Sequence, residues 1–136
     1  MTQLIRLRQM GLFKIEDIQD HKLVQQVSDN TYFAERRFRF LIEWDPTSLL
    51  RIDEQNCVPL DYAALHPTIH GFRSIFELGI RYYPNKKGIS LLFTIDNNGD
   101  TPYQMACSEF GRDEVMKIVE ETLLTSQQQQ QQLRQR

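Results

Sequence analysis

The sequence contains few cysteines and no long apolar run. Its two cysteines, Cys57 and Cys107, can form at most one disulfide, and neither belongs to a Cys-x-x-Cys pair, so a reducing compartment is the simpler expectation. No apolar stretch approaches the roughly 18 residues that a membrane helix requires, and the N-terminus lacks the apolar block of a secretory signal. We therefore expect an intracellular protein, cytoplasmic or alternatively nuclear, that does not enter membranes.

An excess of basic charge is also lacking, because the formal net charge of the 136 residues is −2. Such a chain has no global positive field that would attract nucleic acid or an anionic membrane. One basic group, Arg36, Arg37 and Arg39, alternates with aromatic residues, which is the pattern on which nucleic-acid binding could be argued. The charged outer face of an amphipathic helix has the same composition, so we do not expect a nucleic-acid partner.

Residues for catalysis or zinc binding are scarce. The chain has three histidines. His66 and His70 have the spacing of two helical zinc ligands, but Pro67 lies between them and favours a loop, and no cysteine pair is present. The sequence also lacks a nucleophile elbow and a glycine-rich phosphate loop. We expect no enzyme activity, no small-molecule substrate and no cofactor.

A calcium loop is suggested by three alternating side chains, Asp96, Asn98 and Asp100. The remaining positions do not fit, because Thr101 stands where the loop requires glycine and Cys107 stands where it requires a bidentate acid. A polar turn explains these residues better, and we predict no metal site.

The best-defined stretch of the chain, 96–123, predicts a turn followed by two helices. Thr101 is a suitable N-cap, Pro102 fits the first helical position, and Gln104 completes a Thr-x-x-Gln capping box. Gly111 then separates two segments that each have an apolar face.

Two internal offsets extend this pattern toward the N-terminus. The series of apolar residues from Phe38 to Pro46 recurs 38 residues later, and the series from Ile52 to Ala63 recurs 43 residues later. A turn and an apolar-faced helix therefore occur twice, which is the signature of a repeat architecture. Before the first of these turns, residues 15–27 and the segment with Phe38, Leu41 and Ile42 predict a helical hairpin that ends before Pro46.

The order of Thr101, Pro102 and Ala106 resembles the ankyrin repeat, with its Thr-Pro-Leu-His-x-Ala signature. The resemblance implies an all-α, ankyrin-type helical solenoid of about three repeats (15–52, 53–95 and 96–124) with short β-hairpin fingers, following a lead-in segment at 1–14. That lead-in is basic, like some organelle-targeting peptides, although an ordinary segment has the same composition. Residues that the resemblance makes structural are Asp53, Pro59, Ala63, Gly99, Thr101, Pro102, Ala106 and Gly111.

Several residues of the middle repeat depart from the signature. Asn56 replaces the turn glycine, Val58 replaces the capping threonine, and Asp61 replaces the histidine. Asparagine tolerates a left-handed turn, whereas a valine side chain cannot cap, which costs about 1 kcal/mol. In the last repeat, Gln104 stands at the histidine position.

The two offsets also locate insertions. The difference between them places five extra residues around 85–89, which predicts a longer second finger tipped by Lys86, Lys87 and Gly88. Three extra residues near 66–68 predict a longer loop between the helices of the middle repeat. Beyond Leu124, a run of six glutamines within 125–136 predicts a disordered or frayed-helical tail.

The resemblance implies a non-catalytic module for protein–protein interaction, because ankyrin arrays generally bind partners along finger tips and inner helices. A structural fragment of a longer array is the alternative. A nucleic-acid-binding protein is a weaker one. The residues expected to contact an unidentified protein partner are Glu54, Gln55, Asp61, Asn85, Lys86, Lys87, Asp96, Asn97, Asn98, Gln104 and Met105.

Overall fold

The structure is a computed structural model that describes residues 5, 9–11 and 35–134. Its helices are α4 (Glu35–Trp44), α5 (Pro59–Ala63), α6 (His70–Tyr82), α7 (Lys86–Ser90), α8 (Pro102–Phe110) and α9 (Arg112–Arg134), with 3-10 helices η1 (Pro46–Leu50) and η2 (Leu91–Phe93). The described residues contain no strand. The all-α prediction is therefore confirmed. In place of the expected β-hairpin fingers, the chain forms turns at 53–57 and 96–100.

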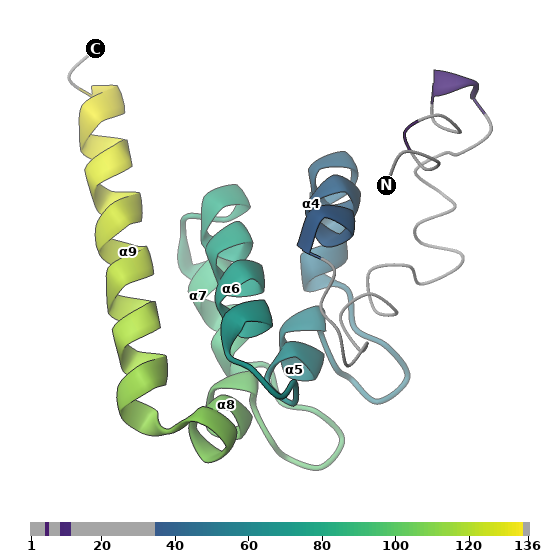
Figure 1. Ribbon diagram of the computed structural model, residues 1–136, viewed down its shortest axis with the longest axis vertical. Helices are drawn as coiled ribbons and strands as arrows, with labels where there is room; N and C mark the ends of the chain where they lie inside the picture. The colour runs from purple at the N-terminus through teal and green to yellow at the C-terminus, as the bar shows by residue number, and fades with distance from the viewer. Residues whose placement is uncertain (1–4, 6–8, 12–34, 135–136) are drawn as a thin grey trace.

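Three helices, α4, α6 and α9, stand side by side, and the short helices α5 and α8 lie toward their lower ends in Figure 1. Helix α7 runs back along α6, and the C-terminal part of α9 extends past the end of α6. The first helix of the predicted hairpin, 15–27, falls outside the described residues. Its second helix is confirmed as α4, which ends before Pro46 and buries Phe38, Leu41 and Ile42.

Helix α6 is the centre of the core. Most of its residues are buried, among them Phe72, Ile75 and Phe76, because it packs against α4, α5, α7 and α9. The apolar residues of α6 face several neighbours, so they do not form a single stripe. Beyond the two ends of the helix, the residues that remain accessible are a row of charged side chains at every fourth position, Arg73, Glu77 and Arg81.

The loop between α5 and α6 occupies residues 64–69, whereas only Gly111 separates α8 from α9. This difference confirms the longer loop predicted near 66–68. Gly111 ends α8 with a φ of 92° and donates its N–H to the carbonyl oxygen of Cys107, as a helix C-cap does. His66 lies in this loop, as Pro67 led us to expect, but its side chain is only 4% exposed.

The five residues inserted around 85–89 do not lengthen a finger, so this prediction is wrong. They form most of helix α7, which packs on α6. Gly88 is buried, and a Cβ at this position would overlap the carbonyl oxygen of Tyr83. The insertion therefore becomes a helical turn, because a glycine allows it to approach the end of α6 closely.

The glutamine run is helical in the structure, which agrees with the frayed-helical alternative and not with a disordered tail. Helix α9 continues to Arg134. Its first half is anchored by the buried Val115 and Ile118, and adding residues to an existing helix costs far less than starting one. Glutamine also has a good helix propensity. None of the described helices, the 23-residue α9 included, is long and apolar enough to cross a membrane.

Candidate functional site

The first turn (53–57) is built around the carboxylate of Asp53. Its Oδ1 accepts hydrogen bonds from the backbone N–H groups of Gln55 and Cys57, both at 2.9 Å. The backbone N–H of Asp53 donates to the carbonyl oxygen of Cys57 at 3.0 Å, and the hydroxyl of Tyr62 donates to Oδ2 of Asp53. Asp53 thus holds the turn through both its side chain and its backbone N–H.

The second turn (96–100) repeats this arrangement around Asp96. Its Oδ1 accepts from the backbone N–H groups of Asn98 at 2.8 Å and Asp100 at 2.9 Å, and its own N–H donates to the carbonyl oxygen of Asp100 at 2.9 Å. Each donor and acceptor lies 43 residues after its counterpart in the first turn. The offset found in the sequence therefore recurs in the hydrogen bonds of the backbone.

Both turns require one residue in the left-handed region. Asn56 has a φ of 60° and Gly99 a φ of 81°, and each donates its backbone N–H to the carbonyl oxygen of the preceding aspartate, at 3.1 Å. Asparagine and glycine are the residues that enter this region most easily. The replacement of glycine by Asn56 therefore preserves the turn.

The helix that follows each turn is capped, but in different ways. Thr101 accepts the N–H of Gln104 at 3.1 Å, and the Gln104 side chain accepts the N–H of Thr101 at 3.2 Å, so the predicted capping box is confirmed. Val58 offers no side-chain acceptor. Only one of the two hydrogen bonds of a capping box is therefore present here: the side chain of Asp61 accepts the backbone N–H of Val58 at 2.9 Å.

The two turns are joined directly to each other through Asn97. Its backbone N–H donates to the carbonyl oxygen of Gln55 at 3.0 Å, and its side-chain amide donates to that of Glu54 at 3.2 Å. The Asn97 side-chain oxygen in turn accepts from the amide of Asn56 at 2.8 Å. Three hydrogen bonds thus stack the second turn on the first and fix their relative position.

Asp61 was predicted as a partner-contacting residue, and this prediction is wrong because only 1% of it is exposed. Burial, together with the smaller effect of the nearby carboxylates of Asp96, Asp53 and Asp100, raises the pKa of Asp61 to about 7. The hydrogen bond from Val58 opposes this shift. Asp61 therefore belongs to the supporting structure beneath the turns.

Cys57 also lies beneath the turns, 8% exposed and not in a disulfide. Burial raises the pKa of its thiol to about 11, and the negative charges of Asp61, Asp53 and Asp96 act in the same direction. A thiol with so high a pKa is a poor nucleophile at neutral pH, because the reactive form is the thiolate.

The predicted contact residues divide into two groups. The turns and α8 expose Glu54, Gln55, Asn97, Asn98 and Gln104, with Asp96 and Met105 partly exposed. Asn85, Lys86 and Lys87 are also exposed, but they lie at the start of α7 and not on the turns at 53–57 and 96–100. The structure thus brings the turn residues together and separates the lysines from them.

Sequence reasoning missed three large apolar residues beside the turns. Ile52 is 53% exposed, Ile95 is 64% exposed and Phe93 is 54% exposed. Ile52 and Ile95 occupy the same position in the two repeats, one residue before the aspartate of each turn. The 43-residue offset already paired these two isoleucines, but an apolar repeat residue is more often buried than exposed.

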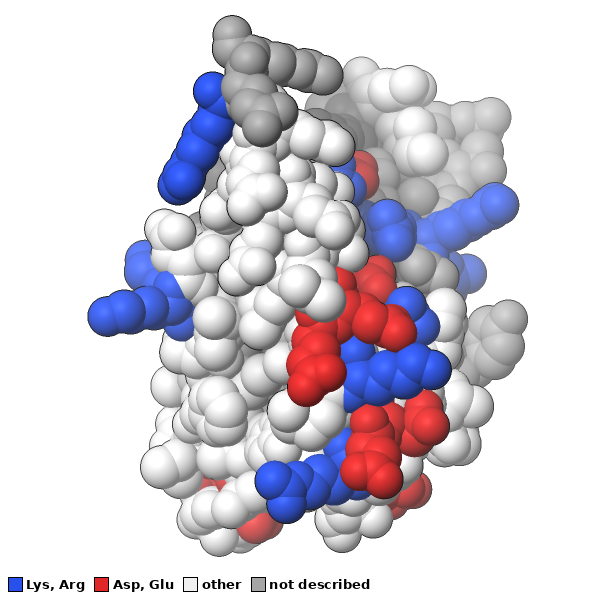
Figure 2. All heavy atoms as spheres, turned by 90° about the vertical axis from the view of Figure 1, so that its left-hand side faces the viewer, with Lys and Arg blue, Asp and Glu red and all other residues white. Residues whose placement is uncertain are grey.

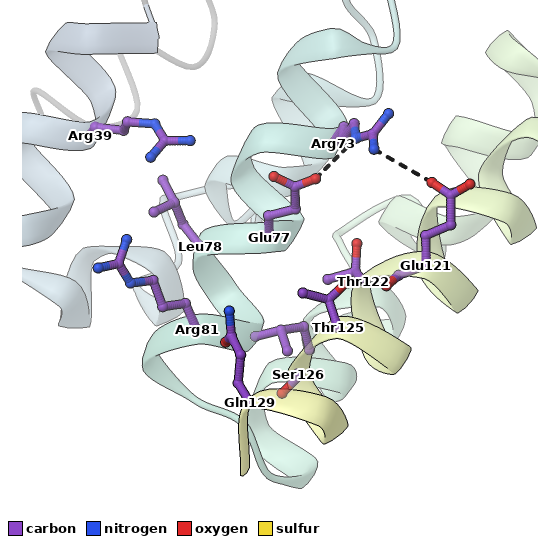
Figure 3. A pocket seen from close by; sticks show the side chains of 11 residues that line it. Arg39, Arg73, Glu77, Leu78, Arg81, Glu121, Thr122, Thr125, Ser126 and Gln129 are labelled. Carbon is purple, nitrogen blue, oxygen red and sulfur yellow. Dashed lines mark hydrogen bonds and ion pairs between the residues drawn. The ribbon is translucent and has the colours of Figure 1, made fainter. Parts of the chain in front are cut away.

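A second candidate for a binding site is a groove lined by residues of α4, α6 and α9, with a cavity volume of about 820 Å³ (Figure 3). Arg39 and Arg81 approach it from α4 and α6, away from the network around Arg73. Its lining residues are Arg39, Arg73, Glu77, Leu78, Ile80, Arg81, Glu121, Thr122, Thr125, Ser126 and Gln129.

Ion pairs account for much of the charge in this groove. Arg73 contacts Glu77 at 3.0 Å on its own helix and Glu121 of α9 at 3.4 Å. Acidic and basic side chains also lie intermixed on the face that carries α9 (Figure 2). Because Arg73 links α6 to α9, we interpret the groove chiefly as a polar seam between these helices.

No group of three or more His, Cys, Asp or Glu side chains in the described part of the chain is placed to hold a metal ion. Asp96, considered above as a calcium ligand, uses one carboxylate oxygen for the backbone of its turn. Comparison with models of protein families, with curated proteins and with solved structures gives no match for this chain.

Proposed function

We propose that this chain is a non-catalytic module that binds another protein through its two stacked turns. The observation that carries the proposal is the direct bonding of the second turn to the first through Asn97. Surface turns that are held in one arrangement lose little conformational freedom when they bind, so less of the interaction energy is spent on ordering them.

We further propose that the architecture is of the ankyrin type, with about three repeats. Two observations support this proposal. The order of turn, inner helix and outer helix occurs twice, and the hydrogen bonds of the two turns join equivalent residues. In such an array each repeat is stabilised by its neighbours. The inserted helix α7 and the absence of strands at 53–57 and 96–100 are departures of this chain from the expected pattern.

The exposed side chains best suited to direct contact are those with no part in the turns themselves. Gln55 and Asn98 qualify, because the hydrogen bonds described for them use only their backbone atoms. Substitution of both by arginine should therefore change the surface and leave the fold intact.

The experiment is affinity capture from a cell extract with the unmodified chain and with the double variant Gln55→Arg/Asn98→Arg. The matched control is Gln128→Arg/Gln131→Arg, which adds the same charge on the exposed side of α9. We expect the unmodified chain and the control to retain the same protein, and the turn variant to lose at least about tenfold in affinity for it.

Thermal unfolding of each variant shows whether the fold is intact. Retention of every captured protein by a folded turn variant would contradict the proposal, as would equal losses from the turn variant and the control. Failure of the unmodified chain to retain any protein specifically would count against a binding module altogether.

A further inference from the structure

The exposed apolar residues beside the turns recur with the repeat. Single exposed apolar side chains are normal on protein surfaces. Here, however, Ile52 and Ile95 stand at equivalent positions and are both more than half exposed, and Phe93 precedes Ile95 by two residues. Phe93 also contacts Tyr103 of α8, with ring centroids 5.7 Å apart. The apolar surface thus continues from the residues just before the second turn onto α8, the helix that follows it.

The same region carries charge of only one sign. Segments 52–72 and 88–111, which include both turns and both inner helices, contain no lysine or arginine, although the chain has 16 of these residues. Arg51 lies just before the first turn, but its guanidinium forms an ion pair with Asp45 at 3.5 Å and donates a hydrogen bond to the hydroxyl of Thr47 at 3.0 Å. The acidic residues of the two segments are Asp53, Glu54, Asp61, Asp96, Asp100 and Glu109.

The negative charge of this region already acts within the fold. Asp53 and Asp96 raise the pKa of the Cys57 thiol and that of the Asp61 carboxyl, in addition to the larger effect of burial. Accumulated carboxylates of this kind attract a cationic ligand and repel an anionic one.

We propose that the acidic turn edge, defined as Ile52, Glu54, Phe93, Ile95, Asp96 and Asp100, binds a segment of a partner protein in which lysine or arginine side chains alternate with apolar ones. The apolar residues of the segment cover the two isoleucines and Phe93. The cationic residues of the segment pair with the surrounding carboxylates. This pairing makes the edge prefer such a segment to apolar segments that carry no positive charge. This inference rests on the proposed function, and it names the chemistry of the partner.

Other occupants fit the edge less well. These segments offer no lysine or arginine to the phosphates of a nucleic acid, whereas nucleic-acid affinity depends on cationic contacts to phosphate. A second copy of the chain that presented the same edge would place like charges opposite one another, which is unfavourable.

The test uses three labelled synthetic peptides of equal length, measured by fluorescence anisotropy at low salt. The first peptide is a repeated sequence of leucine, lysine and serine. The second peptide has glutamate in place of lysine, and the third has serine in place of leucine. We expect the first peptide to bind at least about tenfold more tightly than either of the others, because only it combines apolar area with positive charge.

Two variants then locate the binding. Ile52→Ser/Ile95→Ser removes the apolar part of the edge, and Asp100→Lys reverses one of its charges. Each should weaken binding of the first peptide by about tenfold. The matched controls are Leu124→Ser, because Leu124 is 58% exposed on α9, and Glu120→Lys on the same helix. Both controls should bind as the unmodified chain does.

Equal binding of the three peptides would overturn the proposal, as would binding that the edge variants leave unchanged. An RNA probe that binds through the same edge, or sedimentation that shows a dimer lost in the edge variants, would assign the edge to another occupant. If a captured protein depends on Gln55 and Asn98 but not on Ile52 and Ile95, the proposed function stands and this inference fails.

Discussion

Asp53 and Asp96 each use one carboxylate oxygen to hold two backbone N–H groups, and this arrangement sets the shape of the surface between them. Hydrogen bonds to a charged group are stronger than those between neutral groups. A few side chains therefore hold the backbone of both turns. Asn97 then joins the turns, and Asp61 supports the first inner helix from below.

Asp61 should make the stability of the protein depend on pH. Its pKa is raised from 3.8 to about 7, so between about pH 4 and pH 7 the folded chain holds a proton that the unfolded chain has released. The free energy of unfolding therefore falls as the pH rises through this window and levels off above it. Asp61→Asn cannot ionise and should be more stable than the unmodified chain at about pH 8, by roughly 2 kcal/mol.

Urea unfolding at several pH values measures this effect. Asp113→Asn, on the exposed start of α9, is the matched control for the loss of one negative charge. If the unmodified chain and Asp61→Asn gave the same dependence on pH, the raised pKa of Asp61 would be contradicted.

At the scale of elements, α6 and the helices around it determine where the turns lie. α6 is buried on most sides, and α7 returns along it toward η2 and the second turn. Gly79 faces Leu91 of η2, and Gly88 lies against the backbone of Tyr83. The two glycines therefore allow the inserted residues to pack closely against α6.

Gly88→Ala should destabilise the fold by about 2 kcal/mol or more, because its Cβ would overlap the carbonyl oxygen of Tyr83, a backbone atom that cannot move independently. Gly99→Ala is the comparison. No atom lies within 4 Å of a Cβ there, so only the left-handed backbone opposes the change, at about 1 kcal/mol. Chemical denaturation measures both, and an unchanged midpoint for Gly88→Ala would show that α7 does not pack as described.

At the scale of the whole molecule, the parts of the fold that were predictable from the sequence are those set by local rules. The capping box of Thr101, the end of α4 before Pro46 and the turn at Asp96 follow from neighbouring residues, and each was predicted. The repeat offset of 43 residues extended these rules to Asp53, where the signature itself is weak.

The remaining features depend on contacts between distant residues. Whether Lys86 and Lys87 lie on a finger or on a helix is decided by how closely Gly88 approaches α6. The burial of Asp61 follows from the packing of α5 under the turns, which its polar type does not indicate. The exposure of Ile52 and Ile95 is likewise set by the whole fold, because apolar repeat residues are usually part of a core.

The central claim, that the stacked turns are the surface that binds a partner, is tested most directly by hydrogen–deuterium exchange of the chain alone and with the protein that it captures. We expect slower exchange on binding in segments 52–57 and 93–105, and unchanged exchange in 127–134 of α9. Protection confined to α4 and α9, with both turns unaffected, would contradict the claim.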